Sequence, residues 1–141
     1  MNNMLIDSAD IISMFCRLHT NSKPDIPVRS SEMGVLIFIQ KQDMAVTPMN
    51  ISQFFKITKP SVTSMVNALV KKGYLLKEQS EADKRSYELK TTDKGNKLVE
   101  STYNDYYMSI ELLRDNMGEH AFNQFIESMQ LANVILERGN K

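Results

Sequence analysis

A run of short polar side chains and cations recurs at helical spacing between residues 59 and 71, and no acid interrupts it. Hydroxyl and amide groups can hydrogen-bond the edges of bases, and lysines can bind phosphates, so this face suits contact with a nucleic acid. An ordinary solvated helix face is the alternative interpretation of the same pattern. The candidate contact residues are Lys59, Ser61, Thr63, Ser64, Asn67 and Lys71.

Two short helices are predicted to position these side chains. Thr47 followed by Pro48 indicates a helix start, because the threonine can cap and proline at the first position loses nothing. Thr58 can cap the second helix with Pro60 in its first turn, and Gly73 can end it in a left-handed cap. The second helix also carries an apolar stripe that should pack inward. This stripe comprises Val62, Met65, Val66, Leu69 and Val70.

A hairpin is predicted directly after the second helix. Residues 74–76 begin one strand, and Tyr87, Leu89 and Thr91 alternate with charged residues as expected of the other. The hydrophilic loop between them carries Asp83, Lys84 and Arg85 near its tip. Two short helices followed by such a hairpin are the layout of a winged helix-turn-helix, which reads DNA.

The spacing of these features resembles the signature of the MarR family (multiple antibiotic resistance regulators) of bacterial transcriptional regulators. That signature has a D-x-R wing, here Asp83 to Arg85, followed at fixed spacing by a T-x-x-G helix start, here Thr92 to Gly95. The family usually has leucine where this chain has Thr91, but the departure removes no expected DNA contact.

Roles for individual residues follow from that resemblance. It implies that Lys59, Ser61, Thr63, Ser64 and Asn67 contact base edges. Lys71 and the wing residues Lys84 and Arg85 are further DNA contacts, with Arg85 entering the minor groove. Asp83 is expected to brace the wing by pairing with a nearby cation. The partner is then double-stranded DNA with a palindromic operator, bound by a homodimer.

The expected fold class is mainly α with a small β wing. We predict one domain over residues 1–141, with a winged helix-turn-helix at 30–95 and dimerisation helices at 1–22 and 96–141. The flanking helices should cover about residues 4–20, a segment capped by Ser30 or Ser31, a long stretch from Thr92 to Gly118, and a last stretch to about Leu136. Their apolar stripes favour a dimer over a monomer that folds its two ends together.

Charge is unevenly distributed along a chain whose formal net charge is zero. Residues 47–95 hold nine lysines and arginines against five acids, a surplus of +4, so the rest of the chain carries −4. A basic segment beside an acidic remainder is typical of a protein in which one lobe meets phosphates.

Composition indicates an ordinary globular protein, with 42% hydrophobic and 24% charged residues. The sequence has neither an apolar run of membrane-spanning length nor a signal peptide pattern, so a cytoplasmic location is expected. Cys16 is the single cysteine, which excludes an internal disulfide. We expect neither a metal nor another cofactor, because the two histidines have no ligand spacing of the usual zinc type.

Regulation leaves more than one interpretation open. The resemblance implies a small-molecule effector that releases DNA, and Cys16, His19 and Tyr103 are candidates for its pocket. Cys16 could instead make the protein a thiol-based redox sensor. A winged-helix module for protein contacts without DNA binding is a further alternative. An enzyme is not expected, because the sequence lacks phosphate-loop and nucleophile-elbow motifs.

Overall fold

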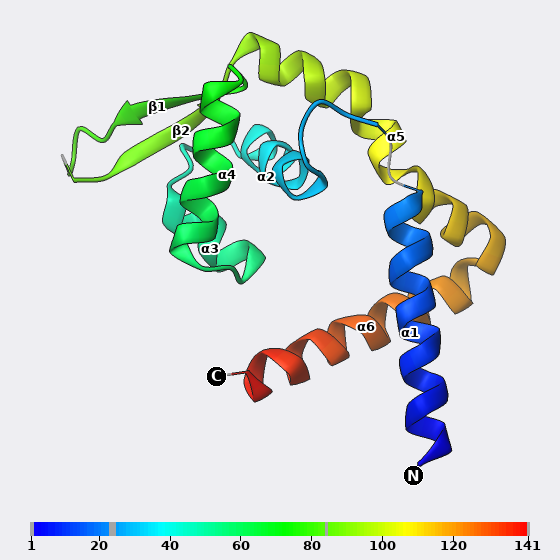
Figure 1. Cartoon of the computed structure of the whole chain (residues 1–141). Coiled ribbons are helices and arrows are strands. Elements are labelled where there is room, and N and C mark those ends of the chain that lie inside the picture. The colour runs from blue at the N-terminus through cyan, green and yellow to red at the C-terminus, as the bar shows by residue number, and fades with distance from the viewer. Residues whose placement is uncertain (1, 23–24, 84, 141) are drawn as a thin grey trace. The chain divides into compact units, whose positions relative to one another are not determined.

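The computed structural model describes residues 2–22, 25–83 and 85–140, and it is mainly α-helical with one small antiparallel sheet (Figure 1). This confirms the expected fold class. Contacts divide the chain into two compact units, which we call the winged unit (Pro24–Tyr103) and the helical unit (Met1–Lys23 with Asn104–Lys141). The elements are α1 (Asn3–Asn21), α2 (Ser30–Lys41), α3 (Pro48–Phe55), α4 (Lys59–Lys71), β1 (Leu75–Gln79), β2 (Tyr87–Thr91), α5 (Asp93–Met117) and α6 (Glu119–Gly139).

Helices α3 and α4 begin where the sequence predicts. Thr47 accepts a hydrogen bond from the amide of Asn50 at 3.2 Å, and the Asn50 side chain accepts one from the Thr47 amide at 2.9 Å. Thr58 accepts a hydrogen bond from the amide of Ser61 at 3.3 Å. Between the helices, Lys56 adopts a left-handed conformation with φ of 56°. These two caps and this turn fix the direction in which α4 leaves α3.

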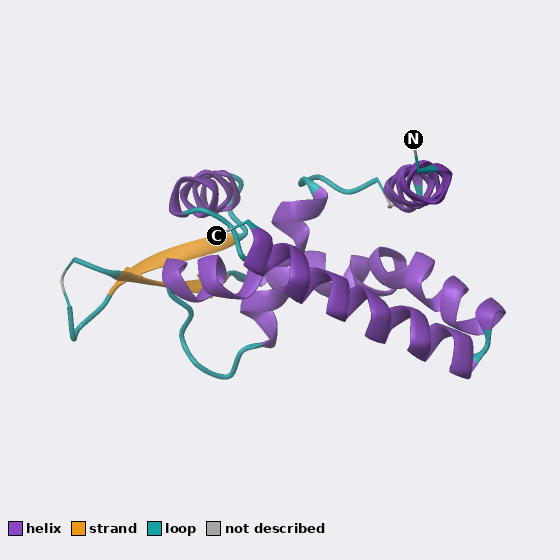
Figure 2. Cartoon of the chain, turned by 90° about the horizontal axis from the view of Figure 1, so that it is seen from below, coloured by secondary structure: helices purple, strands orange, loops and turns teal. Residues whose placement is uncertain are grey.

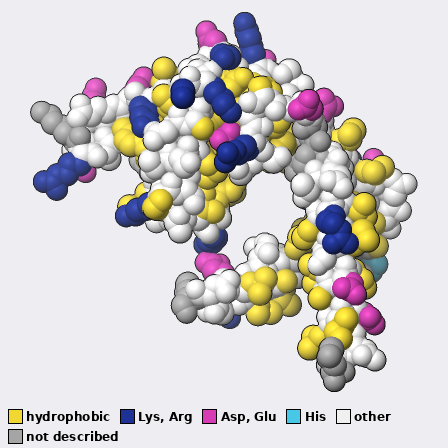
Figure 3. Space-filling model, viewed as in Figure 1, with side chains coloured by type: hydrophobic (Ala, Val, Ile, Leu, Met, Phe, Trp, Pro, Cys, Tyr) yellow, Lys and Arg dark blue, Asp and Glu magenta, His cyan; other side chains and the backbone are white. Residues whose placement is uncertain are grey.

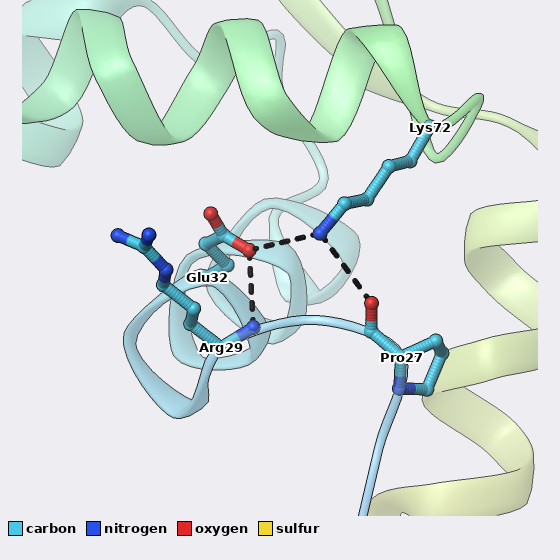
Figure 4. A network of polar contacts seen from close by, with 4 residues as sticks. All are labelled: Pro27, Arg29, Glu32 and Lys72. Carbon is cyan, nitrogen blue, oxygen red and sulfur yellow. Dashed lines mark hydrogen bonds and ion pairs between the residues drawn. The ribbon is translucent and has the colours of Figure 1, made fainter.

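The start of α2 differs from the prediction that Ser30 or Ser31 caps it. Arg29 is the N-cap residue, and its backbone amide donates a 3.0 Å hydrogen bond to the Glu32 carboxylate (Figure 4). Glu32 is only 4% exposed, and its carboxylate lies 3.7 Å from Lys72 Nζ. That ammonium also donates to the Pro27 carbonyl at 3.4 Å (Figure 4). Glu32, three residues after the N-cap, therefore satisfies the Arg29 amide and links the start of α2 to the end of α4.

Replacing Glu32 by alanine is expected to lower the free energy of unfolding by about 1–2 kcal/mol, because the cap is lost and the Arg29 amide loses its partner. Glu32→Gln is the matched control, since its amide oxygen can still accept that bond. It should lose less than half as much, because the Lys72 side chain is 44% exposed and such pairs are weak. Urea denaturation followed by circular dichroism measures both. Equal losses would mean that the ion pair, and not the cap, stabilises α2.

The core of the winged unit joins its helices to the sheet. The strands β1 and β2 form an antiparallel hairpin with Leu75 opposite Thr91 and Gln79 opposite Tyr87 (Figure 2). Val46 adds a bridge to this sheet, because its carbonyl accepts a 2.7 Å hydrogen bond from the Leu89 amide. The largest fully buried side chains are Met33, Leu36, Ile37, Ile51, Leu69, Leu75, Leu89, Val35, Val62 and Val66.

A compact junction connects the end of α4, the base of the hairpin and the start of α5. Gly73 has φ of +86°, and the amides of Gly73 and Tyr74 close the α4 end by donating to Val70 and Leu69. The Thr92 hydroxyl donates to the Gly73 carbonyl at 2.6 Å and accepts from the Gly95 amide at 3.0 Å. A Cβ on Gly95 would collide with the Tyr74 carbonyl oxygen. The T-x-x-G motif thus caps the start of α5, and its threonine hydroxyl also donates to the carbonyl of Gly73, just after the end of α4.

The helical unit leaves much of its apolar surface uncovered, and neither α1 nor α6 has a buried residue. Figure 3 shows the hydrophobic side chains over these helices. Within the unit, Phe15 contacts Phe125 edge to face with ring centroids 5.6 Å apart. Across the described ranges, every helix is too short or too polar to cross a bilayer. Side chains of the unit that are more than half exposed include Met4, Leu5, Ile11, Ile12, Leu18, Leu131, Ile135 and Leu136.

Candidate nucleic-acid interface

The structure places all the α4 candidates on one exposed face. The opposite face is sealed, because Val62, Val66 and Leu69 are at most 1% exposed. The polar side chains of α4 project away from this buried face, so they are available to solvent or to a binding partner. Figure 3 shows Lys and Arg side chains over α4 and the hairpin. The exposed candidates are Lys59, Ser61, Thr63, Ser64, Asn67 and Lys71.

Several of these groups already have partners within the chain. The Thr63 hydroxyl donates to the Lys59 carbonyl at 3.0 Å, and the Ser61 hydroxyl lies 3.0 Å from that of Thr58. Both hydroxyls keep lone pairs for an incoming donor. The α4 face can therefore offer acceptors and donors in fixed positions.

Asn67 is held by a residue that the sequence did not single out. Lys77 of β1 donates a 2.8 Å hydrogen bond to the Asn67 side-chain oxygen, and its ammonium lies 4.9 Å from the centre of the Tyr87 ring. The amide nitrogen of Asn67 remains available as a donor. Lys77 lies ten residues beyond Asn67, after a turn, so no helical pattern pairs the two.

The wing tip is organised by hydrogen bonds that Asp83 accepts from backbone amides. Its carboxylate accepts from the Arg85 amide at 2.9 Å, and its carbonyl accepts from the Ser86 amide at 3.1 Å. A short acidic side chain favours such a local turn. The expected pairing of Asp83 with a nearby cation stays a prediction. Arg85 is exposed, and Lys84 lies outside the described residues.

Further along the wing, Lys90 and Glu78 form an exposed cross-strand ion pair at 2.9 Å. The hydrogen bond to Glu78 and the charge of that carboxylate raise the pKa of Lys90 above its ordinary value. Lys90 therefore stays charged, but its partner offsets the positive field that it would add to the wing.

A groove brings the wing and α4 together. It has a volume of about 430 Å³ and lies between the starts of α3 and α4 and the second strand. Lys59 of α4 and Arg85 of the wing both line it, so two cations distant in sequence converge on one surface. The remaining lining residues are Thr47, Pro48, Met49, Val62, Thr63, Ser86 and Tyr87.

The candidates for an effector or redox site lie in different parts of the chain. In the helical unit the His19 ring stacks on Phe15 at 5.7 Å, and its Nδ1 lies 3.3 Å from the Ser109 hydroxyl. Cys16 is exposed, and Arg17, the cation beside it in sequence, points a nitrogen at the Met14 sulfur at 3.8 Å.

Tyr103 is the third of these candidates, and it is assigned to the winged unit. Cys16 and His19 belong to the helical unit instead. The three candidates are therefore not assembled into one site by either unit taken alone.

The winged unit matches a known protein family. Residues 25–86 match a sequence profile described as MarR family. A search of curated protein sequences found no significant match. The family profile covers α2 through the hairpin loop, which includes every α4 candidate.

Solved structures with the same fold cover nearly the whole chain. FabT from Streptococcus pneumoniae, in complex with DNA, shares 24% sequence identity at a TM-score of 0.73, over 97% of this chain and 99% of that one. The S. aureus MepR–DNA complex shares 16% identity at a TM-score of 0.82, over 92% and 96%. A MarR/EmrR family transcriptional regulator from Acinetobacter sp. ADP1 shares 20% identity at a TM-score of 0.76, over 97% and 99%. These likenesses establish the fold.

Proposed function

We propose that this chain, whose residues 25–86 belong to the MarR family, is a sequence-specific DNA-binding transcriptional regulator and not an enzyme. The observation that carries the proposal is that Lys59 and Thr63, from the acid-free face of α4, line one groove together with Arg85 of the wing. Two of the solved structures with this fold are DNA complexes, of FabT and of MepR, which supports the same role here.

In this mechanism α4 enters the major groove and presents its hydroxyl, amide and ammonium groups to base edges and phosphates. Arg85 reaches into the adjacent minor groove, where narrow A·T-rich segments attract a cation. The Asp83 carboxylate holds the amide of Arg85 and so fixes where the wing tip turns. Lys77 orients the Asn67 side chain by donating to its oxygen, which leaves the amide nitrogen of Asn67 to donate. Lys71 and Lys84 add phosphate contacts.

The protein acts as a homodimer in this proposal, because the helical unit exposes apolar side chains that a monomer leaves in water. Large exposed apolar patches on a small protein mark interaction surfaces. Two copies related by a two-fold axis would present two α4 helices to half-sites about one helical turn apart. The operator is then an imperfect palindrome.

Charging the α6 surface is expected to separate the protomers. Leu131→Glu combined with Ile135→Glu alters side chains that are 62% and 58% exposed, so the fold of the chain should tolerate both. Sedimentation equilibrium should give the mass of one chain for this variant and twice that mass for the parent. Met44→Glu, at an 83% exposed site of the winged unit, is the control and should stay dimeric. An unchanged mass for the double variant would rule out α6 as the interface.

We further propose that the regulator represses transcription in the cytoplasm and releases DNA when a small-molecule effector binds. A thiol switch at exposed Cys16 is the alternative, because an accessible thiol is open to oxidants. Titration with peroxide separates the two, since only the thiol switch loses DNA binding on oxidation. Cys16→Ser should then be insensitive to peroxide, whereas an effector-controlled protein should bind DNA equally well before and after treatment.

Selection of bound fragments from random DNA is the experiment that tests the function itself. The parent chain should enrich a motif with two inverted half-sites, because each protomer reads one of them. A variant with Lys59→Glu and Lys71→Glu is the matched control, and it should enrich nothing. Recovery of the same sequences by both chains, or of no motif by the parent, would contradict specific DNA binding.

A further inference from the structure

A second cavity of the winged unit lies apart from the α4 face and has no role in the function proposed above. Its volume is about 630 Å³, within the range of small-molecule sites. It is formed by the end of α2, the loop that follows and the outer side of α3. The described residues that line it are Phe38, Gln42, Met44, Ala45, Val46, Asn50, Gln53 and Phe54.

One wall of this cavity is an ordered aromatic cluster. The rings of Phe38 and Phe54 stack with centroids 4.4 Å apart, and both meet the Phe55 ring edge to face. Phe54 is nevertheless 63% exposed, and Met44 across the cavity is 83% exposed. Packing against its neighbours holds the exposed ring in place, so it presents a fixed aromatic face at little further entropic cost.

The polar groups of the cavity are neutral amides. The Gln42 nitrogen donates to the Phe38 carbonyl at 3.0 Å, which leaves the side-chain oxygen of Gln42 as an acceptor. The Asn50 oxygen accepts from the Thr47 amide at 2.9 Å, which leaves the Asn50 nitrogen as a donor. Gln53 adds a third amide. The lining therefore offers both donors and acceptors in defined positions.

No charged side chain is among the described residues that line the cavity. A charged ligand would lose hydration there without gaining a counter-ion, which is unfavourable. A flat uncharged ring could stack against Phe54 without losing the hydration of a charge. We propose that this cavity is a binding site for a small uncharged planar aromatic molecule that carries one hydroxyl or amide group. The site belongs to the winged unit alone and does not depend on DNA binding.

The test uses two fluorescent probes that differ by one charge. N-phenyl-1-naphthylamine is uncharged, whereas 1-anilinonaphthalene-8-sulfonate carries a sulfonate on the same ring system. The full-length protein should bind the uncharged probe saturably and more tightly than the sulfonate. Phe54→Ala should weaken binding of the uncharged probe at least about fivefold, because a stacking partner is lost. Leu76→Ala, at a 49% exposed apolar site outside the cavity, should leave it unchanged.

Nuclear magnetic resonance locates the probe independently of any variant. Adding N-phenyl-1-naphthylamine to the ¹⁵N-labelled protein should shift the side-chain amide signals of Gln42, Asn50 and Gln53. Three results would overturn the proposal. These are no saturable binding, shifts confined to other amides, and a Phe54-dependent site that takes the sulfonate equally well.

Discussion

An Arg85→Ala chain is expected to bind its operator about 50-fold more weakly than the parent at 0.1 M salt. Each cation that neutralises a phosphate adds about 0.9 to the slope of log affinity against log salt. Between 1 M and 0.1 M salt, the two copies of Arg85 in a dimer therefore contribute about 1.8 log units of affinity. Arg85 is exposed at the wing tip, and Asp83 engages only its backbone amide among the described contacts. The guanidinium is therefore not needed for the turn, and its removal should not disturb the wing.

The salt dependence of that binding provides the sharper measurement. A plot of log affinity against log salt should become shallower by about 2 for the dimer, or about 1 for each copy of Arg85. Arg114→Ala is the matched control, because Arg114 is an exposed arginine of the helical unit paired with Asp115. Its slope should equal that of the parent. Parallel slopes for Arg85→Ala and the parent would show that the wing does not reach DNA.

Gly95→Ala is expected to destabilise the fold by about 3 kcal/mol, which lowers the melting temperature by about 10 °C for a chain of this size. The added Cβ would overlap the Tyr74 carbonyl, a backbone atom that can move only by disturbing the junction. Movement there also strains the hydrogen bond from the Thr92 amide to that same carbonyl, which is 3.1 Å long. The loss therefore exceeds that of an ordinary helix substitution.

Gly139→Ala provides the control for that experiment. Gly139 is the last residue of α6, and an added Cβ there meets nothing within 4 Å. It should be neutral or slightly stabilising, because alanine favours a helix over glycine. Thermal unfolding followed by circular dichroism compares the two variants. Similar melting temperatures for both would refute the idea that the T-x-x-G glycine is selected by a close backbone approach.

Local chemistry made much of the winged unit predictable. Thr47 and Thr58 cap their helices as expected, because each threonine hydroxyl can accept from an amide of a first turn that tolerates proline. Gly73 adopts the left-handed conformation that its position after an apolar stripe indicated. The polar face of α4 followed from helical periodicity alone. These signals act within four residues of one another, so a sequence displays them directly.

Contacts between distant segments were not predictable in the same way. The buried Glu32 replaces a serine cap, because a carboxylate can reach back to Arg29 while Lys72, forty residues away, offsets its charge. The Lys77 bond to Asn67 depends on how the hairpin lies against α4. The bond from the Arg85 amide to the Asp83 carboxylate depends on how the wing tip turns, which the residue types alone do not give. Each of these contacts could be identified only from the three-dimensional structure.

The junction between Gly73 and Thr92 has a consequence for the order of folding events. The bond between these residues closes a loop of 19 residues, so the entropy lost in forming it is small. Loops of this length close quickly, so we expect the hairpin base to be the nucleus from which α4 and α5 extend. Thr92→Ala should then slow refolding far more than it speeds unfolding. The same threonine that closes the T-x-x-G turn would set the rate at which the chain reaches its native state.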